Sequence, residues 1–147
     1  MKNKLIKGDI LNVQQGIICH QVNCMGKMGA GIALSIRKKW PSVYQDYIAA
    51  YDKGQLQLGN VLLSPVVIAQ LYVANLCGQY RYGRDKRYTD YGALETCLKR
   101  VREMGERLNL TVFVPYKMGC SLAGGDWKVV EDMINKAVPT SIIVKLD

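Results

Sequence analysis

At 147 residues and with 49% apolar residues, the chain is long enough for one domain with a substantial core and too short for two, so we expect residues 1–147 to form a single domain. Twenty Lys and Arg residues against twelve Asp and Glu residues give a net charge of +8, which favours anionic partners and is equally consistent with simple solubility. No apolar run approaches the roughly 20 residues of a membrane span, and the first ten residues lack the apolar core of a signal peptide.

The cysteine pattern argues against a metal site. Five cysteines occur, no two of them form a CxxC pair, and a single histidine is present as a further ligand. Zinc sites need closer spacings, whereas reduced thiols are usual in a cytosol. We therefore expect a cytoplasmic, monomeric protein that needs no metal or cofactor and does not contact a membrane.

Apolar runs and helical repeats alternate along the chain. Strands are expected at residues 4–7, 16–22, 61–65, 67–76, 111–115 and 141–146, which are rich in Val, Ile, Leu and Tyr. Helices are expected from residue 29 or 30 to 39, from 42 to about 53, at 90–108 and from 127 onward. The alternation predicts a three-layer α/β/α sandwich around a mixed, largely parallel sheet of about six strands.

Two glycine-rich loops each follow a strand and open a helix. The first contains Gly26, Gly29 and Gly31, and the second covers residues 118–127. Residues without a Cβ let backbone N–H groups approach a ligand, and the helix start adds partial positive charge, so such a loop favours a phosphate. The same glycines would also serve a tight turn with nothing bound. The presence of a second loop of the same kind is what favours an anion site.

Three polar residues stand at the ends of expected elements. Asp9 either caps a turn or accepts a hydrogen bond from the amino group of a base. His20 is either a core residue or a group at the C-terminal end of its strand, where open α/β sheets bind ligands. Asp126 fits the N-cap of the helix that begins at Trp127.

Residues 77–88 form a basic segment interleaved with tyrosines and too polar for the core. Such a segment either contacts nucleic acid through phosphates and bases or is a mobile loop. Because it follows a strand end, we expect it beside the ligand site. There Arg81, Arg84, Lys86 and Arg87 would steer an anionic substrate by long-range attraction.

A series of stretches resembles a macro domain. They are Gly8-Asp9-Ile10, His20-Gln21-Val22-Asn23-Cys24-Met25-Gly26, Met28-Gly29-Ala30-Gly31-Ile32-Ala33, Val73-Ala74-Asn75-Leu76 and the run from Pro115 to Trp127. The resemblance runs in order over nearly the whole chain. Within the family, the chain looks closest to the branch of ADP-ribose-1''-phosphate phosphatases and related terminal ADP-ribose hydrolases.

This resemblance implies an ADP-ribose pocket at the C-terminal ends of the strands. In it, Asp9 holds the adenine amino group with help from the Ile10 backbone, and Leu146 either covers the adenine or belongs to the core. Two facing loops would cradle the diphosphate and the distal ribose, as backbone donors can. These loops consist of Met28, Gly29, Ala30, Gly31 and Ile32, and of Met118, Gly119, Cys120, Ser121 and Leu122.

The resemblance also limits the chemistry. Family members that form a covalent intermediate carry a lysine and an aspartate where this chain has Gln79 and Ala123, so an imine mechanism lacks both groups. His20, Asn23 and Asp126 match the phosphatase branch, with Asp126 activating a water and His20 acting as the acid. The expected activity is hydrolysis of ADP-ribose-1''-phosphate to ADP-ribose and phosphate. The alternatives are a non-catalytic ADP-ribose reader and a hydrolase that removes ADP-ribose from protein or nucleic acid.

Overall fold

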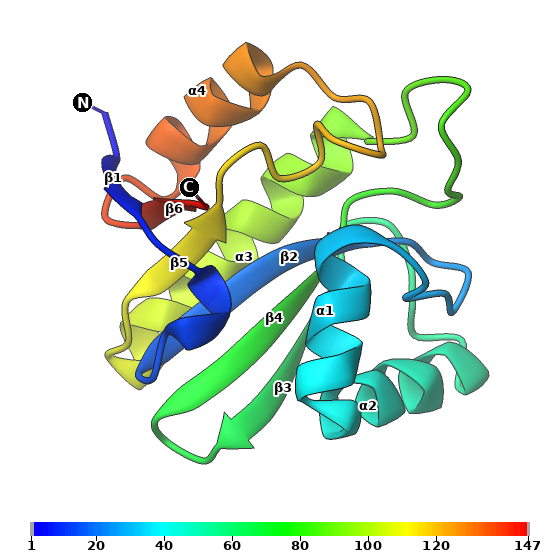
Figure 1. The fold of residues 1–147 in the computed structure, drawn as a ribbon, viewed down its shortest axis with the longest axis horizontal. Helices are drawn as coiled ribbons and strands as arrows, with labels where there is room; N and C mark the ends of the chain where they lie inside the picture. Colours follow the sequence, from blue (N-terminus) through cyan, green and yellow to red (C-terminus); the bar gives the residue numbers. More distant parts are fainter. Residues whose placement is uncertain (1, 147) are drawn as a thin grey trace.

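The computed structural model describes residues 2–146, which form a six-stranded sheet with helices on both faces (Figure 1). The strands are β1 (Lys4–Lys7), β2 (Gly16–Val22), β3 (Val61–Val67), β4 (Leu71–Cys77), β5 (Val112–Pro115) and β6 (Ile142–Lys145). The helices are α1 (Gly31–Lys39), α2 (Pro41–Asp52), α3 (Tyr91–Leu108) and α4 (Trp127–Ala137), and a short 3-10 helix, η1 (Ile10–Asn12), follows β1. The strand order is β1-β6-β5-β2-β4-β3, and all neighbours run parallel except β3 and β4. The expected mixed, largely parallel sheet is confirmed.

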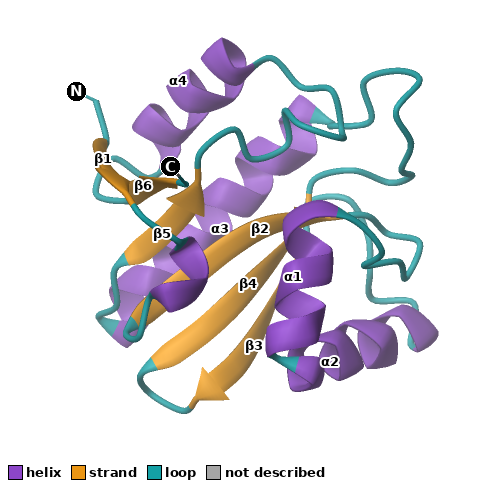
Figure 2. Ribbon diagram, viewed as in Figure 1, coloured by secondary structure: helices purple, strands orange, loops and turns teal. Residues whose placement is uncertain are grey.

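Strand β2 is buried along its whole length because helices cover both faces of the sheet. Figure 2 shows α1 and α2 in front of the sheet and α3 and α4 behind it. Successive β2 side chains serve opposite layers: Ile17 packs with the buried residues of α3 and α4, whereas Ile18 packs in a cluster that Ile32 of α1 joins. The three-layer α/β/α sandwich is therefore confirmed.

The strand predicted at residues 67–76 is wrong in its first part. β3 continues to Val67, and the chain turns at residues 68–70 before β4 begins at Leu71. Ala69 occupies the left-handed region with φ 67°, which glycine or asparagine usually fills, so the apolar run hides the turn. Pro65 is tolerated within β3 because this strand lies at the edge of the sheet.

The other predicted elements are present, with ends shifted by a residue or two. α1 begins at Gly31, because Gly29 and Ala30 remain extended or bent ahead of it. α3 begins where the Asp90 carboxylate accepts a hydrogen bond from the Ala93 backbone N–H at 2.9 Å. It ends at Asn109, whose left-handed backbone terminates the helix.

The topology brings several loops to one edge of the sheet. Five of the six strands run parallel, so the segments that follow β1, β2, β4 and β5 leave from the same edge, together with the end of β6. Both glycine-rich loops and the segment 78–90 therefore meet there. In residues 2–146, no helix is long and apolar enough to cross a membrane.

Candidate ligand-binding site

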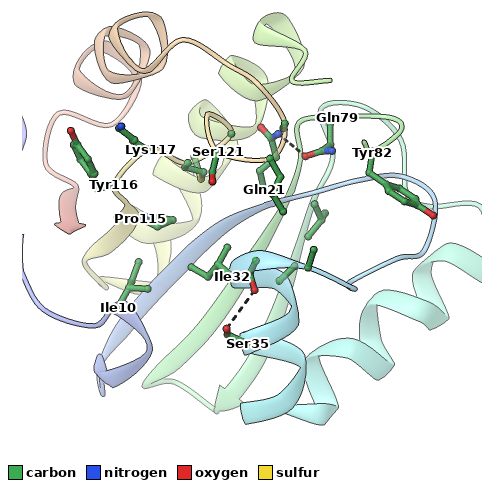
Figure 3. A pocket seen from close by; sticks show the side chains of 18 of the residues that line it. Ile10, Gln21, Ile32, Ser35, Gln79, Tyr82, Pro115, Tyr116, Lys117 and Ser121 are labelled. Carbon is green, nitrogen blue, oxygen red and sulfur yellow. Dashed lines mark hydrogen bonds between the residues drawn. The ribbon is translucent and has the colours of Figure 1, made fainter. Parts of the chain in front are cut away.

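A cavity of about 710 Å³ opens at this edge of the sheet (Figure 3). Its walls come from the end of β1 and η1, from the loop between β2 and α1, from the segment after β4, and from the loop between β5 and α4. The lining residues are 8–11, 21–23, 27, 29–33, 35, 79, 82–84, 115–119, 121–123, 144 and 146. The volume lies in the range of small-molecule sites in proteins.

Nearly all the residues expected to contact the ligand line this cavity. Those that do are Asp9, Ile10, Gly29, Ala30, Gly31, Ile32, Met118, Gly119, Ser121, Leu122 and Leu146. Met28 does not line it, because its side chain is buried in a cluster with Tyr47 and Cys24. Cys120 does not line it either: its Sγ donates to the Met118 carbonyl at 3.4 Å.

The first glycine loop presents an open helix N-terminus to the cavity. Ala30 is the N-cap of α1, and no side chain accepts a hydrogen bond from the first turn. Gly31 has φ 58°, and a Cβ there would meet only Leu122 of the opposite loop, at 3.4 Å. The uncapped N–H groups and the partial positive charge of α1 are therefore free to bind an anion.

The second glycine loop is held rigidly by backbone hydrogen bonds. The Gly125 N–H donates to the Gly119 carbonyl at 2.9 Å, and the Tyr88 and Thr89 N–H groups donate to the Ala123 carbonyl at 2.7 and 3.3 Å. Gly119 has φ 75°, which favours glycine at this position. The loop is thus fixed against the end of the segment 78–90 and faces α1 across the cavity.

A chain of side-chain amides fixes the middle of the cavity wall. The Gln21 Nε2 donates to Gln79 Oε1 at 2.8 Å (Figure 3). It also donates to Thr89 Oγ1 at 2.9 Å. Thr89 Oγ1 in turn donates to the Gly119 carbonyl at 2.6 Å. A Cβ at Gly78 would lie 2.5 Å from Gln21 Oε1, so glycine is needed for this close packing. Gln21 was not among the predicted site residues, although it sits at the C-terminal end of a buried strand.

The structure does not bring the three predicted catalytic side chains together at the cavity. His20 is 0% exposed and does not line the cavity, and its Nε2 lies 2.6 Å from Asn75 Oδ1. Burial lowers the pKa of His20 to about 4, partly opposed by the Asn75 hydrogen bond, so the ring is neutral at pH 7. Asp126 is exposed, does not line the cavity, and caps α4 by accepting from the Lys128 N–H at 2.9 Å.

Asn23 is the one of these three residues that lines the cavity. Its hydrogen bonds show that it shapes the turn at residues 23–27. Its Oδ1 accepts from the N–H groups of Met25 and Lys27 and from the Tyr47 hydroxyl, at 3.0, 3.3 and 2.9 Å. Its Nδ2 donates to the Lys27 carbonyl at 2.8 Å. The side chain thereby folds residues 23–27 into the turn that leads to the first glycine loop.

Cys120, which lies between the cavity-lining residues Gly119 and Ser121, is not poised as a nucleophile. Burial, aided by the negative charge of Asp126, raises the pKa of the Cys120 thiol to about 11. A thiol with this pKa is almost entirely protonated at neutral pH. Within residues 2–146 there is also no cluster of three or more His, Cys, Asp or Glu side chains that could hold a metal ion.

One end of the cavity has a shape and chemistry suited to a base. Asp9 accepts from the Leu11 N–H at 2.9 Å through Oδ1, which caps η1 and leaves its second oxygen available. Leu146 is 70% exposed beside the cavity, so the alternative of a core role is wrong. In Figure 3, Ile10 and Tyr116 lie at this end, and Tyr82 lies at the other.

The charge around the cavity is positive. Three cationic side chains line it, Lys27, Arg84 and Lys117. Asp9 is the single carboxylate among the described lining residues. Gln79 and Ala123 also line the cavity. These are the two positions where this chain lacks the lysine and the aspartate of the family members that form a covalent intermediate.

Fold and cavity together define an α/β/α domain with a positively charged cleft at the C-terminal edge of its sheet. The chain belongs to the macro-domain family, whose Macro domain model matches residues 19–134. The resemblance seen in the sequence is thereby confirmed.

Several relatives carry names that bear on function. An ADP-ribose 1''-phosphate phosphatase from Debaryomyces hansenii is 30% identical, over 90% of this chain and 92% of that protein. A DNA ADP-ribosyl glycohydrolase from Thermus aquaticus is 26% identical over 92% of this chain, which spans only 37% of that protein's length. Among solved structures, a protein of unknown function from Bacteroides thetaiotaomicron has a TM-score of 0.89 and 30% identity, covering 100% of this chain and 99% of the other.

Proposed function

We propose that the chain binds ADP-ribose in the cavity and hydrolyses the bond between its distal ribose and an attached group. The observation that carries the binding step is the uncapped N-terminus of α1, which faces a second glycine loop across a cavity whose described lining holds three cations and one carboxylate. Two facing sets of backbone donors suit a diphosphate better than any neutral ligand.

The ends of the cavity orient the ligand. The adenine lies against Ile10, Tyr116 and Leu146, with its amino group donating to Asp9. The diphosphate lies between the two glycine loops. The distal ribose then reaches the amides of Gln21, Asn23 and Gln79, which offer donors and acceptors to its hydroxyl groups.

Hydrolysis of ADP-ribose-1''-phosphate is our first candidate for the reaction. Its support is the phosphatase name of a relative that matches this chain over nearly the whole of both sequences. No histidine or carboxylate lines the distal end among the described residues, so rate enhancement would come from positioning and from N–H donors to the phosphoryl oxygens.

Removal of ADP-ribose from a nucleic acid is the second candidate. It is favoured by the open distal end, where the exposed Tyr82 and Arg84 line the cavity, and by the glycohydrolase name of a relative. A reader that binds without turnover remains the outcome if neither substrate reacts.

Calorimetry with ADP-ribose tests the binding step, and AMP is the control because it lacks the second phosphate and the distal ribose. We expect ADP-ribose to bind more tightly than AMP. No heat at millimolar ADP-ribose would refute the proposal. Release of phosphate from ADP-ribose-1''-phosphate, and of ADP-ribose from a modified oligonucleotide, then decides between the two reactions.

A further inference from the structure

Three exposed tyrosines come from two segments next to the loop of residues 23–28, and one of them, Tyr82, lines the cavity. Tyr51, Tyr80 and Tyr82 are 44%, 52% and 54% exposed, while the remaining tyrosines of the chain are buried or partly buried. They come from the end of α2 and from the segment after β4. We refer to these three residues as the tyrosine platform.

The loop of residues 23–28 links the members of the platform. The Cys24 N–H donates to the Tyr80 carbonyl at 2.9 Å, which places Tyr80 against this loop. On the other side, a Cβ at Gly26 would lie 3.0 Å from the Tyr51 ring, so Tyr51 packs on the same loop. Figure 1 shows the loop, the segment 78–90 and the end of α2 at the same side of the molecule. Tyr82 itself lines the cavity.

Cations flank the platform. Lys27, Arg81 and Arg84 are exposed, and the first and last of them also line the cavity. Asp85 is the one carboxylate of residues 80–88; the hydrogen bond from the Tyr88 hydroxyl lowers its pKa and keeps it charged, and the three cations outnumber it. The platform is therefore a basic surface with separated aromatic rings.

The other two cations of the segment are engaged differently. Lys86 lies over the Tyr88 ring at 5.3 Å, and Arg87 lies over the Tyr91 ring at 4.3 Å. The steering role expected from the sequence requires only positive charge, and Lys86 and Arg87 were among the residues expected to supply it. Exposed rings beside Lys27, Arg81 and Arg84 are a feature that steering does not require.

We propose that the tyrosine platform binds the single-stranded nucleic acid to which a cavity-bound ADP-ribose is attached. This inference rests on the proposed function, because the distal ribose points toward Tyr82 and any linked chain must leave there. Bases stack on exposed aromatic rings irrespective of sequence, and Arg and Lys pair with the phosphates between them. A protein partner would instead favour a contiguous apolar patch, whereas these rings are interspersed with cations.

Binding of unmodified DNA tests the platform without requiring turnover. The probe is a fluorescein-labelled single strand of mixed sequence and roughly 12 nucleotides, followed by anisotropy at several salt concentrations. Tyr80 and Arg81 are the residues to change, because neither lines the cavity. Tyr80→Leu removes the stacking face and should weaken binding about tenfold, whereas Tyr80→Phe retains it and should match the wild type.

Charge reversal separates local contact from bulk attraction. Arg81→Glu should weaken binding and reduce the slope of log K against log salt by about 0.7, the value for one phosphate contact on a single strand. Arg107→Glu makes the same change in net charge on an exposed residue in the last turn of α3, near the start of β5 and away from the cavity, and should have little effect.

Each outcome bears on the proposal. Simultaneous binding of the oligonucleotide and saturating ADP-ribose is expected, and displacement of one by the other would overturn it. The proposal would also be overturned if Arg81→Glu and Arg107→Glu weakened oligonucleotide binding equally, or if Tyr80→Leu bound the oligonucleotide as tightly as the wild type. An acidic protein would then be the partner that fits this surface. Calorimetry with ADP-ribose on the same variants should show unchanged affinity, so failure of the proposed function is recognised separately.

Discussion

Replacement of Gly29 by alanine should separate ligand binding from folding. The backbone of Gly29 lies outside the left-handed region, and a Cβ added there would meet no atom within 4 Å. The variant should therefore fold without strain. Because alanine restricts the unfolded chain, its free energy of unfolding should be unchanged or higher by about 0.4–1 kcal/mol.

The same methyl group should obstruct the ligand. Gly29 lines the cavity just before the N-terminus of α1, where the proposed diphosphate approaches the backbone. Moving a phosphate oxygen off one N–H donor loses a hydrogen bond to a charged group, about 1.5–3 kcal/mol. The dissociation constant of ADP-ribose should then rise about 10- to 150-fold.

Gly92→Ala provides the matched control. Gly92 is the second residue of α3, and a Cβ there would meet only Asp90 Oδ1, at 3.5 Å. Both variants are measured by thermal denaturation and by calorimetry with ADP-ribose, and Gly92→Ala should keep wild-type affinity. Wild-type affinity in a stable Gly29→Ala protein would refute the assignment of this loop to the diphosphate. A loss of stability would refute the argument from open space.

Four further changes test the site and its supports. Asp9→Ser keeps an oxygen that can cap η1 but withdraws the carboxylate from the base, so ADP-ribose affinity should fall by about 1–2 kcal/mol in calorimetry. Ribose 5-phosphate binding should be unchanged, and equal losses would mean that Asp9 supports the fold. Asp126→Ser preserves the cap of α4 and should leave the thermal midpoint and phosphate release unchanged; a tenfold slower release would show that the carboxylate reaches the substrate. Thr89→Val removes the hydroxyl between Gln21 and Gly119 and should cost about 1–3 kcal/mol in urea unfolding, so wild-type stability would contradict the importance of this network. His20 has a folded-state pKa of about 4 against a usual 6.5, so the unfolded chain binds the extra proton and stability falls as pH drops through this window, by up to about 3 kcal/mol. His20→Gln should lack this component of the pH dependence, and an identical loss in both proteins would refute it.

The two glycine loops could be predicted because their signal is local. Each is a loss of side-chain bulk between a buried strand and a helical repeat, and both lie where expected. The hairpin turn at Ala69 was not predicted, because no such local signal is present there and the surrounding sequence looks like an apolar strand. For Leu146 the sequence left two alternatives open, because an apolar residue next to a buried strand fits a core role and a ligand-binding role equally well, whichever way the chain leaves the sheet.

The placement of His20 shows a different limit. A strand covered on both faces has no polar alternation, so its sequence does not reveal which side chains face the ligand. His20 turned inward to Asn75, and its neighbour Gln21 reached the cavity. The partners of Gln21 come from Gln79 and Thr89, each more than 50 residues away along the chain, so their meeting depends on the assembled fold.

The pairing of β1 with β6 joins the two ends of the described chain in one sheet. The Asn3 side chain donates to the carbonyl and the hydroxyl of Ser141, 138 residues away, and β1 lies in register with β6 alone. Asp9 follows β1 and Leu146 follows β6, and both residues line the cavity. The base-binding end of the cavity therefore depends on a contact between the two ends of the described chain, whereas the two glycine loops rest on inner strands of the sheet.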